Sequence, residues 1–321
     1  MRVAVTGAGG RLGSAVIGAL TDSPLVADVL EWDLPLHDLD DPVSAWRLVS
    51  AYRPDVVVHT AAWTDVDGCA GDPALAMRRN GLAAGEMAEA CVRADAALVM
   101  VSTNEVFDGR RTDGLGYRPT DLPNPPNSYG AAKLAGERAA REAYGATGDV
   151  FTAAALQPVD EGEPGLPALA IVRTAWLFGP PGADFPQKIL AAARKADSAG
   201  QALSLVADEV GCPTYASDLA GAIVALIAEW SRPGGRSLAG IHHIVNSGQA
   251  SRAEWARRVL SLAGVDVATI EVRLETWPRP SSPPPWGVLE PTPLPCGLLR
   301  PWQDAAAEYM TFIAPSPKPR Q

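Results

Sequence analysis

The first thirteen residues constrain the fold of this chain more than any other segment. Residues 3–6 form a short apolar run, glycines follow at Gly7, Gly10 and Gly13, and a helical spacing of apolar residues begins at Arg11. A glycine-rich turn between a strand and a helix lets a pyrophosphate approach the backbone and meet the free N–H groups of the helix N-terminus. This segment predicts a dinucleotide-binding βα unit. The alternative is a glycine turn with a purely structural role.

Strand and helix signals then alternate through the first half of the chain. The strand signals are continuous apolar runs rather than alternating ones, which is typical of a parallel sheet covered on both faces. Repeated βα units of this kind predict an α/β fold with a Rossmann-like, doubly wound parallel sheet. We expect further strands at residues 26–32, 55–60 and 97–102, and helices at residues 42–51 and 74–94.

The second half of the chain has a more mixed pattern. A strand is expected at residues 170–174, helices at 219–230 and 252–262, and a proline-rich loop at 278–295. We therefore expect a dinucleotide-binding domain over residues 1–170 and a smaller, mainly substrate-binding α/β region over residues 171–321. Residues 146–168 are rich in glycine, proline and acidic residues, which indicates a surface insertion within the first domain.

Charge and composition exclude several classes of partner. The 321 residues carry a formal net charge of −10, which disfavours nucleic acid and anionic membrane as partners. No apolar run reaches the roughly 18 residues that a membrane-spanning helix needs, and no secretory leader opens the chain. The four cysteines form no CxxC pair and are expected to be isolated thiols. A cytoplasmic protein is the expectation.

An acidic residue follows the second expected strand at the distance required for ribose recognition. Asp33 lies 20 residues after Gly13. A carboxylate at that point accepts hydrogen bonds from a ribose hydroxyl and repels a 2′-phosphate. The alternative is an ordinary solvated loop acid. Asp38 and Leu39, which come next, are placed to flank an adenine.

A tyrosine and a lysine four residues apart indicate catalysis. Tyr129 and Lys133 are predicted to share one face of a helix that runs from residue 127 to about 143, capped by Asn127 or Ser128. A nearby cation is expected to lower the pKa of the phenol from its usual value near 10. Thr103, at the end of a strand, would place its hydroxyl beside a substrate carbonyl. A chance pair on a solvated helix is the alternative.

Together these segments resemble the dTDP-4-dehydrorhamnose reductase family within the extended short-chain dehydrogenase/reductase superfamily. The likeness extends over nearly the whole chain, with residues 146–168 as the main excess. It is carried by TGAGGRLG at 6–13, RPDVVVHTAAWTDVD at 53–67, STNEVFDG at 102–109, NSYGAAKLAGE at 127–137, VRTAWLFGP at 172–180, DEVGCPTYASDLA at 208–220 and the pair Arg279-Pro280.

The resemblance implies roles for individual residues. Tyr129 would donate the proton, Lys133 would assist it and hold the nicotinamide ribose, and Thr103 would bind the carbonyl. Asn104 and Trp176 would face the sugar. The residues implied in cofactor binding are Gly7, Gly10, Arg11, Leu12, Gly13, Asp33, Asp38, Leu39, Ala62, Trp63, Thr64, Tyr129 and Lys133.

The chain departs from the family pattern at two places. Asn104-Glu105 stands where the family usually has Asp-Tyr, which puts the identity of the sugar in question. Leu34 stands where relatives often have arginine, which bears on the choice of cofactor, and NADH is expected to be used at least as well as NADPH. Many relatives bind a metal at a dimer interface, but no acidic pair here suits one, so we expect no metal; a homodimer is compatible with the resemblance.

The resulting hypothesis is an NADH- or NADPH-dependent reduction of the 4-keto group of a nucleotide-linked, dTDP-type 4-keto-6-deoxy sugar. Two alternatives stay open at this point. One is a catalytically silent homologue that binds NADP and regulates a partner. The other is a nucleotide-sugar epimerase or dehydratase on the same scaffold.

Overall fold

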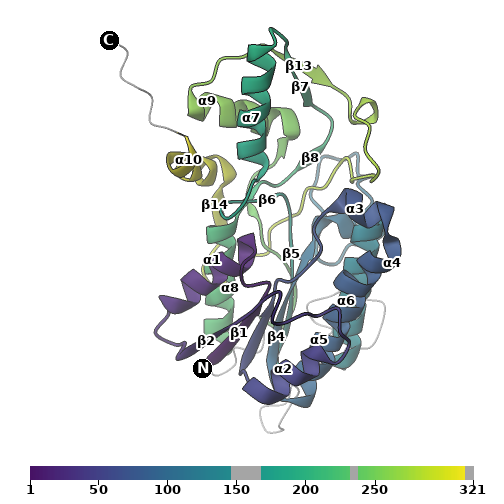
Figure 1. Ribbon diagram of the computed structural model, residues 1–321, viewed down its shortest axis with the longest axis vertical. Coiled ribbons are helices and arrows are strands. Elements are labelled where there is room, and N and C mark those ends of the chain that lie inside the picture. Colours follow the sequence, from purple (N-terminus) through teal and green to yellow (C-terminus); the bar gives the residue numbers. More distant parts are fainter. Residues whose placement is uncertain (146–167, 232–237, 315–321) are drawn as a thin grey trace.

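A six-stranded parallel sheet forms the centre of the computed structural model, which describes residues 1–145, 168–231 and 238–314 (Figure 1). The strand order is β10-β5-β4-β3-β1-β2, and every neighbouring pair is parallel. This confirms the expected Rossmann-like sheet. Its strands are β1 (Arg2–Thr6), β2 (Asp28–Trp32), β3 (Val56–His59), β4 (Ala97–Thr103), β5 (Leu169–Thr174) and β10 (Gly240–His243).

Helices cover both faces of the sheet, as continuous apolar strands require. Every residue of β3 and of β5 is buried. In Figure 1 one face carries α1 and α8, and the other carries α2, α5 and α6. Each layer has its own apolar core against the sheet. These helices are α1 (Arg11–Thr21), α2 (Ser44–Tyr52), α5 (Ala83–Arg93), α6 (Ser128–Ala143) and α8 (Ala216–Trp230).

The order of the strands creates a crevice at one edge of the sheet. β1 lies between β2 and β3. The chain therefore leaves β1 toward one side of the sheet, to β2, and leaves β3 toward the other side, to β4. In open parallel sheets ligands bind outside the carboxyl ends of the strands at this point. The glycine turn after β1 and the segment after β3 therefore border the expected binding crevice.

The single helix expected at residues 74–94 is instead interrupted. The chain forms α4 (Pro73–Ala76), one π-helical turn at Met77–Leu82, and then α5. The turn packs very closely on α6, since a Cβ atom on Gly136 would lie 2.9 Å from the Asn80 carbonyl oxygen. The irregular turn thus lies where two helices are in close contact. The periodicity of one helix does not reveal such a contact, so the sequence did not predict the interruption.

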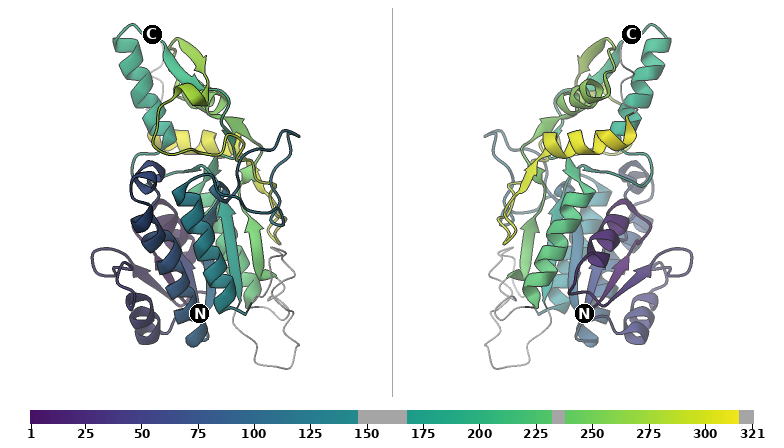
Figure 2. Two further views of the ribbon diagram at one scale, coloured as in Figure 1. Left: turned by 90° about the vertical axis from the view of Figure 1, so that its right-hand side faces the viewer. Right: turned by 90° about the vertical axis from the view of Figure 1, so that its left-hand side faces the viewer.

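The second half of the chain adds a smaller unit above the sheet, with its own apolar core. It contains α7 (Phe185–Ser198), α9 (Arg252–Ala263) and the parallel pair β7 (Leu203–Val206) and β13 (Thr269–Val272). Figure 2 shows α10 (Trp302–Ile313) lying across the junction between this unit and the sheet. The helices expected at 219–230 and 252–262 are confirmed as α8 and α9, whereas α7 and α10 were not predicted.

The sheet takes β10 and most of β5 from beyond residue 170, so the division of the chain at that residue stays a prediction. Of the expected insertion at 146–168, residues 146–167 lie outside the described part. None of the described helices is long and apolar enough to cross a bilayer. The remaining short elements are α3 (Val66–Gly71), β6 (Leu177–Phe178), β8 (Val210–Gly211), β9 (Thr214–Tyr215), β11 (Asn246–Ser247), β12 (Ala250–Ser251), β14 (Leu299–Pro301) and two 3₁₀ turns, Asn104–Val106 and Leu274–Thr276.

Candidate active site

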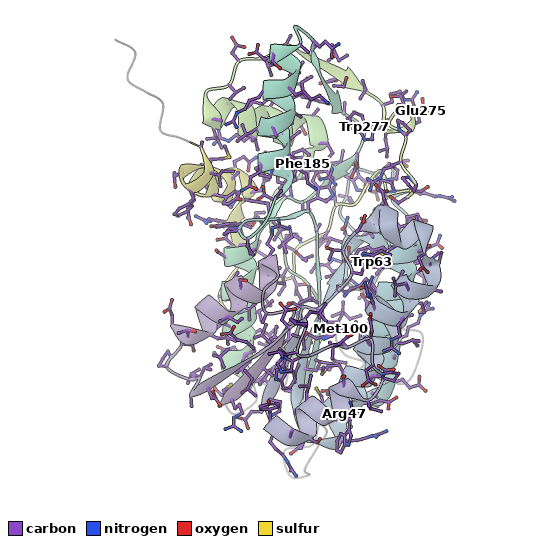
Figure 3. All side chains as sticks on the ribbon, viewed as in Figure 1. Arg47, Trp63, Met100, Phe185, Glu275 and Trp277 are labelled. Carbon is purple, nitrogen blue, oxygen red and sulfur yellow. The ribbon has the colours of Figure 1, made fainter. Side chains whose placement is uncertain are left out.

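A cleft of about 1020 Å³ lies between the carboxyl edge of the sheet and the smaller unit. Figure 3 labels two of its lining residues, Trp63 in the segment after β3 and Phe185 at the start of α7. All of the residues predicted from the sequence line this one cleft: Gly7, Gly10, Arg11, Leu12, Gly13, Asp33, Asp38, Leu39, Ala62, Trp63, Thr64, Thr103, Asn104, Tyr129, Lys133 and Trp176.

The glycine turn has the geometry of a phosphate cradle. Gly7 has a φ of +65°, and a Cβ atom there would lie 2.9 Å from the backbone of Ala61. A Cβ atom on Gly13 would lie 2.1 Å from the Gly7 carbonyl oxygen, so only glycine lets α1 pack this closely. Gly10 precedes the first residue of α1, and no side chain caps that end. The free N–H groups of the first turn are therefore available to an anion.

Asp33 is bound to the glycine turn. Its Oδ2 atom accepts a hydrogen bond of 2.6 Å from the Gly9 N–H, and its Oδ1 atom accepts one of 2.8 Å from the Leu34 N–H. These two bonds fix the carboxylate at the crevice. A carboxylate oxygen has more than one lone pair, so both atoms keep the capacity to accept a further bond from a ribose hydroxyl.

The segment after β3 is held in place by Asn80, which sequence analysis missed. Asn80 is buried in the π-helical turn, and its amide accepts from the Trp63 N–H at 2.8 Å and donates to the Trp63 carbonyl at 3.0 Å. Above the Trp63 ring lies the guanidinium of Arg79, which Asp40 binds through both carboxylate oxygens. The signal that could have indicated this role is an asparagine within a predicted helix, because a buried asparagine must find hydrogen-bond partners.

Tyr129 and Lys133 lie one turn apart on α6, which begins at the predicted cap. The Asn127 side chain accepts a hydrogen bond from the Gly130 N–H at 2.9 Å. Lys133 is 3% exposed and donates to the Val101 carbonyl at 2.6 Å. Burial lowers its pKa to about 8, an effect that the Glu137 carboxylate opposes. Lys133 therefore carries its positive charge below about pH 8.

The expectation that Lys133 brings the pKa of Tyr129 below its usual value is wrong. Burial raises the pKa of the phenol well above 10, and the nearby carboxylate of Glu105 adds to the rise. A hydrogen bond from Thr103 opposes it. The low-dielectric surroundings and the acidic neighbour both penalise the phenolate. Tyr129 is thus fully protonated at neutral pH, which suits a proton donor.

A buried ion pair lies next to the tyrosine–lysine pair of α6. Glu137 lies one turn after Lys133 on α6 and accepts two hydrogen bonds from Arg173 of β5, at 3.0 and 2.7 Å. Both side chains are fully buried. Ser102, next to Thr103, also donates a hydrogen bond to Glu137. The pair therefore connects α6, which presents Tyr129 and Lys133, to β5 and to the end of β4, which presents Thr103.

The structure shows that Asn104 and Trp176, both predicted to face the sugar, have other partners. The Asn104 amide nitrogen donates to the Gly287 carbonyl at 3.1 Å, so one of its two N–H donors is used by the proline-rich loop. Trp176 has a φ of +44°, and the guanidinium carbon of Arg252 lies 3.6 Å from its ring centroid. One apolar face of this ring is therefore covered. Contact of either residue with a sugar stays a prediction.

Several charged residues of the cleft were not predicted from the sequence. Arg252 donates from Nε and Nη2 to one oxygen of Glu209, at 3.0 and 2.8 Å. Arg279, noted before only as part of a motif, pairs with Asp67 at 3.1 Å and closes one side of the cleft. The spacing of residues in the sequence does not identify these two arginines, because they reach their carboxylate partners only in the folded structure. Further cleft residues that sequence analysis did not select are Asp184, Phe185 and Lys188, and Glu105, noted there only as a departure from the family pattern, also lines the cleft.

The described residues contain no group of three or more histidine, cysteine, aspartate or glutamate side chains that could hold a metal ion. The expectation of an enzyme without a bound metal remains a prediction.

Comparison with known proteins identifies the family. The model of the RmlD substrate binding domain family matches residues 1–154 and 159–313. The chain belongs to this family. It is 34% identical to a dTDP-4-dehydrorhamnose reductase of Mycobacterium tuberculosis, over 98% of this chain and 94% of the relative. It is 33% identical to a dTDP-4-keto-6-deoxy-D-glucose reductase of Streptomyces niveus, over 82% of this chain and 78% of the relative.

A solved structure has the same fold. The dTDP-4-dehydrorhamnose reductase of Bacillus anthracis, in complex with NADP, superposes with a TM-score of 0.80 at 29% identity, covering 97% of this chain and 99% of that one. The family matches confirm the resemblance drawn from the motifs.

Proposed function

We propose that this member of the family reduces the keto group of a dTDP-linked 4-keto-6-deoxy sugar with NADH or NADPH. The observation that carries the proposal is the convergence of Thr103, Tyr129 and Lys133 in the same cleft as the glycine cradle. Relatives named as dTDP-sugar reductases support the choice of substrate class.

The cleft fits a dinucleotide. The cradle of Gly7, Gly10 and Gly13 would hold the pyrophosphate against the N-terminus of α1, Asp33 would bind a ribose hydroxyl, and Trp63 would border the nicotinamide half. When bound, the reduced nicotinamide supplies the hydride.

The side chains of the cleft account for the proton and for the charge on oxygen. Thr103 and Tyr129 present two hydroxyl groups that can hydrogen-bond one carbonyl oxygen. The high pKa of Tyr129 keeps its proton available until charge develops on that oxygen. Lys133, positively charged below about pH 8, would stabilise the phenolate left behind and would hold the cofactor ribose.

The alternative functions make different predictions for the cofactor. A silent homologue gives no reason for a hydroxyl, a phenol and an ammonium group in one cleft. An epimerase returns the hydride to its sugar and consumes no cofactor overall. Net oxidation of NADH or NADPH in proportion to added sugar therefore separates reduction from both alternatives. A cytoplasmic location and a homodimer also stay predictions.

The purified chain is expected to oxidise NADH or NADPH when a dTDP-4-keto-6-deoxy sugar is added. The measurement is the loss of absorbance at the nicotinamide band, with the reduced sugar quantified by chromatography. One sugar reduced for each cofactor oxidised supports the proposal. A changed sugar without cofactor oxidation would establish epimerase or dehydratase chemistry instead.

NADH is expected to be used at least as well as NADPH. The two arginines near the adenosine side are both engaged, Arg79 with Asp40 and Arg11 with the Gly179 carbonyl at 2.6 Å. Asp33 would repel a 2′-phosphate, and Leu34 offers it no positive charge. The measurement is kcat/KM for each cofactor. A tenfold or larger preference for NADPH, about 1.4 kcal/mol, would contradict this prediction.

The matched variant is Leu34→Arg. Leu34 lines the cleft and is 64% exposed, so an arginine there can reach a 2′-phosphate without disturbing the core. This variant is expected to shift the cofactor preference toward NADPH and to leave kcat/KM for NADH nearly unchanged.

A further inference from the structure

Glu105 is held rigidly against the helix that carries Tyr129. It follows Thr103 in the 3₁₀ turn after β4, and its N–H donates to the Thr103 hydroxyl at 3.2 Å. A Cβ atom on Gly130 would lie 2.1 Å from the Glu105 carbonyl oxygen, so the first turn of α6 rests on this peptide. The backbone of Glu105 is therefore in close contact with the first turn of α6, which carries Tyr129.

The carboxylate of Glu105 has only one of its oxygens engaged. Oε2 accepts a hydrogen bond of 2.6 Å from the Asn127 amide, and the side chain lines the cleft. Within residues 1–145, 168–231 and 238–314, no second hydrogen bond or ion pair of this carboxylate is found. A carboxylate offers about four lone pairs, so Oε1 is left to accept from a group inside the cleft.

The arginines around Glu105 are bound to other carboxylates. Arg252 donates twice to Glu209, and Arg279 donates to Asp67. Both lie near enough to stabilise the charge on Glu105, but burial dominates and raises the pKa of its carboxyl group. Oε1 faces the cleft, so a ligand that displaces solvent from it has to supply a hydrogen-bond donor in its place or lose that interaction.

We propose that Glu105 is a specificity-determining residue that selects sugars with a hydrogen-bond donor, a hydroxyl or an amino group, on the ring near the keto carbon. This inference rests on the proposed function, because the keto oxygen must lie at Thr103 and Tyr129 for the ring to face Glu105. The shared turn and helix put that carboxylate beside the two hydroxyls. A deoxy sugar would leave Oε1 without a partner.

The test is Glu105→Gln, which keeps the size of the side chain. The amide oxygen of glutamine can still accept from Asn127, so the free position changes from an acceptor to an NH₂ donor. Four dTDP-4-keto-6-deoxy sugars are compared: the parent hydroxyl sugar, a 3-amino analogue, and 2-deoxy and 3-deoxy analogues. The measurements are kcat/KM and the Kd of each sugar by calorimetry with the oxidised cofactor bound.

Wild type is expected to prefer the hydroxyl or amino sugar over one deoxy analogue by about 10- to 100-fold. Glu105→Gln is expected to remove most of that preference and to change kcat/KM for the deoxy analogue by less than about threefold. A larger loss for the amino sugar would identify an ammonium group as the preferred donor, and a larger loss for the hydroxyl sugar would identify a hydroxyl. Equal losses for all four sugars would overturn the proposal, since they indicate a general effect on Tyr129 or on folding.

The calorimetric measurement separates this inference from the proposed function. If no sugar is reduced but wild type binds the donor-bearing sugars more tightly and Glu105→Gln does not, the proposed reaction fails and the specificity role stands. If sugars are reduced without any preference for a donor, the reaction stands and the role of Glu105 is refuted. The matched control is Glu275→Gln. Glu275, labelled in Figure 3, is exposed and does not line the cleft, so this variant is expected to behave as wild type.

Discussion

Replacement of Tyr129 by phenylalanine is expected to lower kcat by about 10²–10⁴-fold, the usual contribution of a general acid. The ring packs against a small cluster that includes Cys69, Ala76 and Ala132, and phenylalanine retains this packing. Only the hydroxyl that protonates the keto oxygen is removed. The measurement is the rate of cofactor oxidation with saturating sugar, together with cofactor affinity and the thermal midpoint of unfolding, which should both be nearly unchanged.

The control is Tyr144→Phe. Tyr144 follows the last residue of α6 and donates its hydroxyl to the Ala96 carbonyl at 2.9 Å, outside the cleft. This change also removes one phenolic hydroxyl and is expected to leave kcat within about twofold of wild type. A Tyr129→Phe enzyme that keeps more than about half of the wild-type rate would show that the proton comes from elsewhere.

Replacement of Glu137 by alanine is expected to reduce the free energy of unfolding by about 3–5 kcal/mol, the cost of removing one partner from a buried ion pair. Glu137 and Arg173 are fully buried and share two hydrogen bonds. Alanine leaves the guanidinium charge without its carboxylate and the Ser102 hydroxyl without its acceptor. The measurement is urea unfolding followed by circular dichroism, in the absence of cofactor.

A paired variant separates the loss of charge balance from the loss of volume. Glu137→Gln combined with Arg173→Met removes both charges and retains most of the packing. It is expected to be more stable than Glu137→Ala, because replacing both partners of a buried pair costs less than removing one. A loss of less than about 1 kcal/mol for Glu137→Ala would indicate that the pair contributes little to folding.

Local spacing in the sequence was sufficient to predict those parts of the site that come from a single helix or from a single strand–turn–helix unit. The glycine turn was predictable because Gly7, Gly10 and Gly13 lie within a single strand–turn–helix unit. The pair of Tyr129 and Lys133 was predictable because positions four apart always share a helix face. The sheet followed from continuous apolar runs, which only burial on both faces explains.

The tertiary structure decided what each of these residues touches. Asn80 reaches Trp63 because a π-helical turn packs on α6, and Asn104 meets the carbonyl of Gly287, a residue 183 positions away. The pKa of Tyr129 rises because burial and Glu105 surround the phenol, where sequence spacing had suggested a fall caused by Lys133.

The amino-acid sequence by itself therefore determined the fold class, the cradle and the identity of the three predicted catalytic groups, since these depend on residues close together in the chain. The partners of Glu105, Arg252 and Glu137 depend on which elements pack side by side. Hydrogen bonds and burial act over a few ångströms of space irrespective of distance along the chain, and so the electrostatics of the site emerged only from the folded structure.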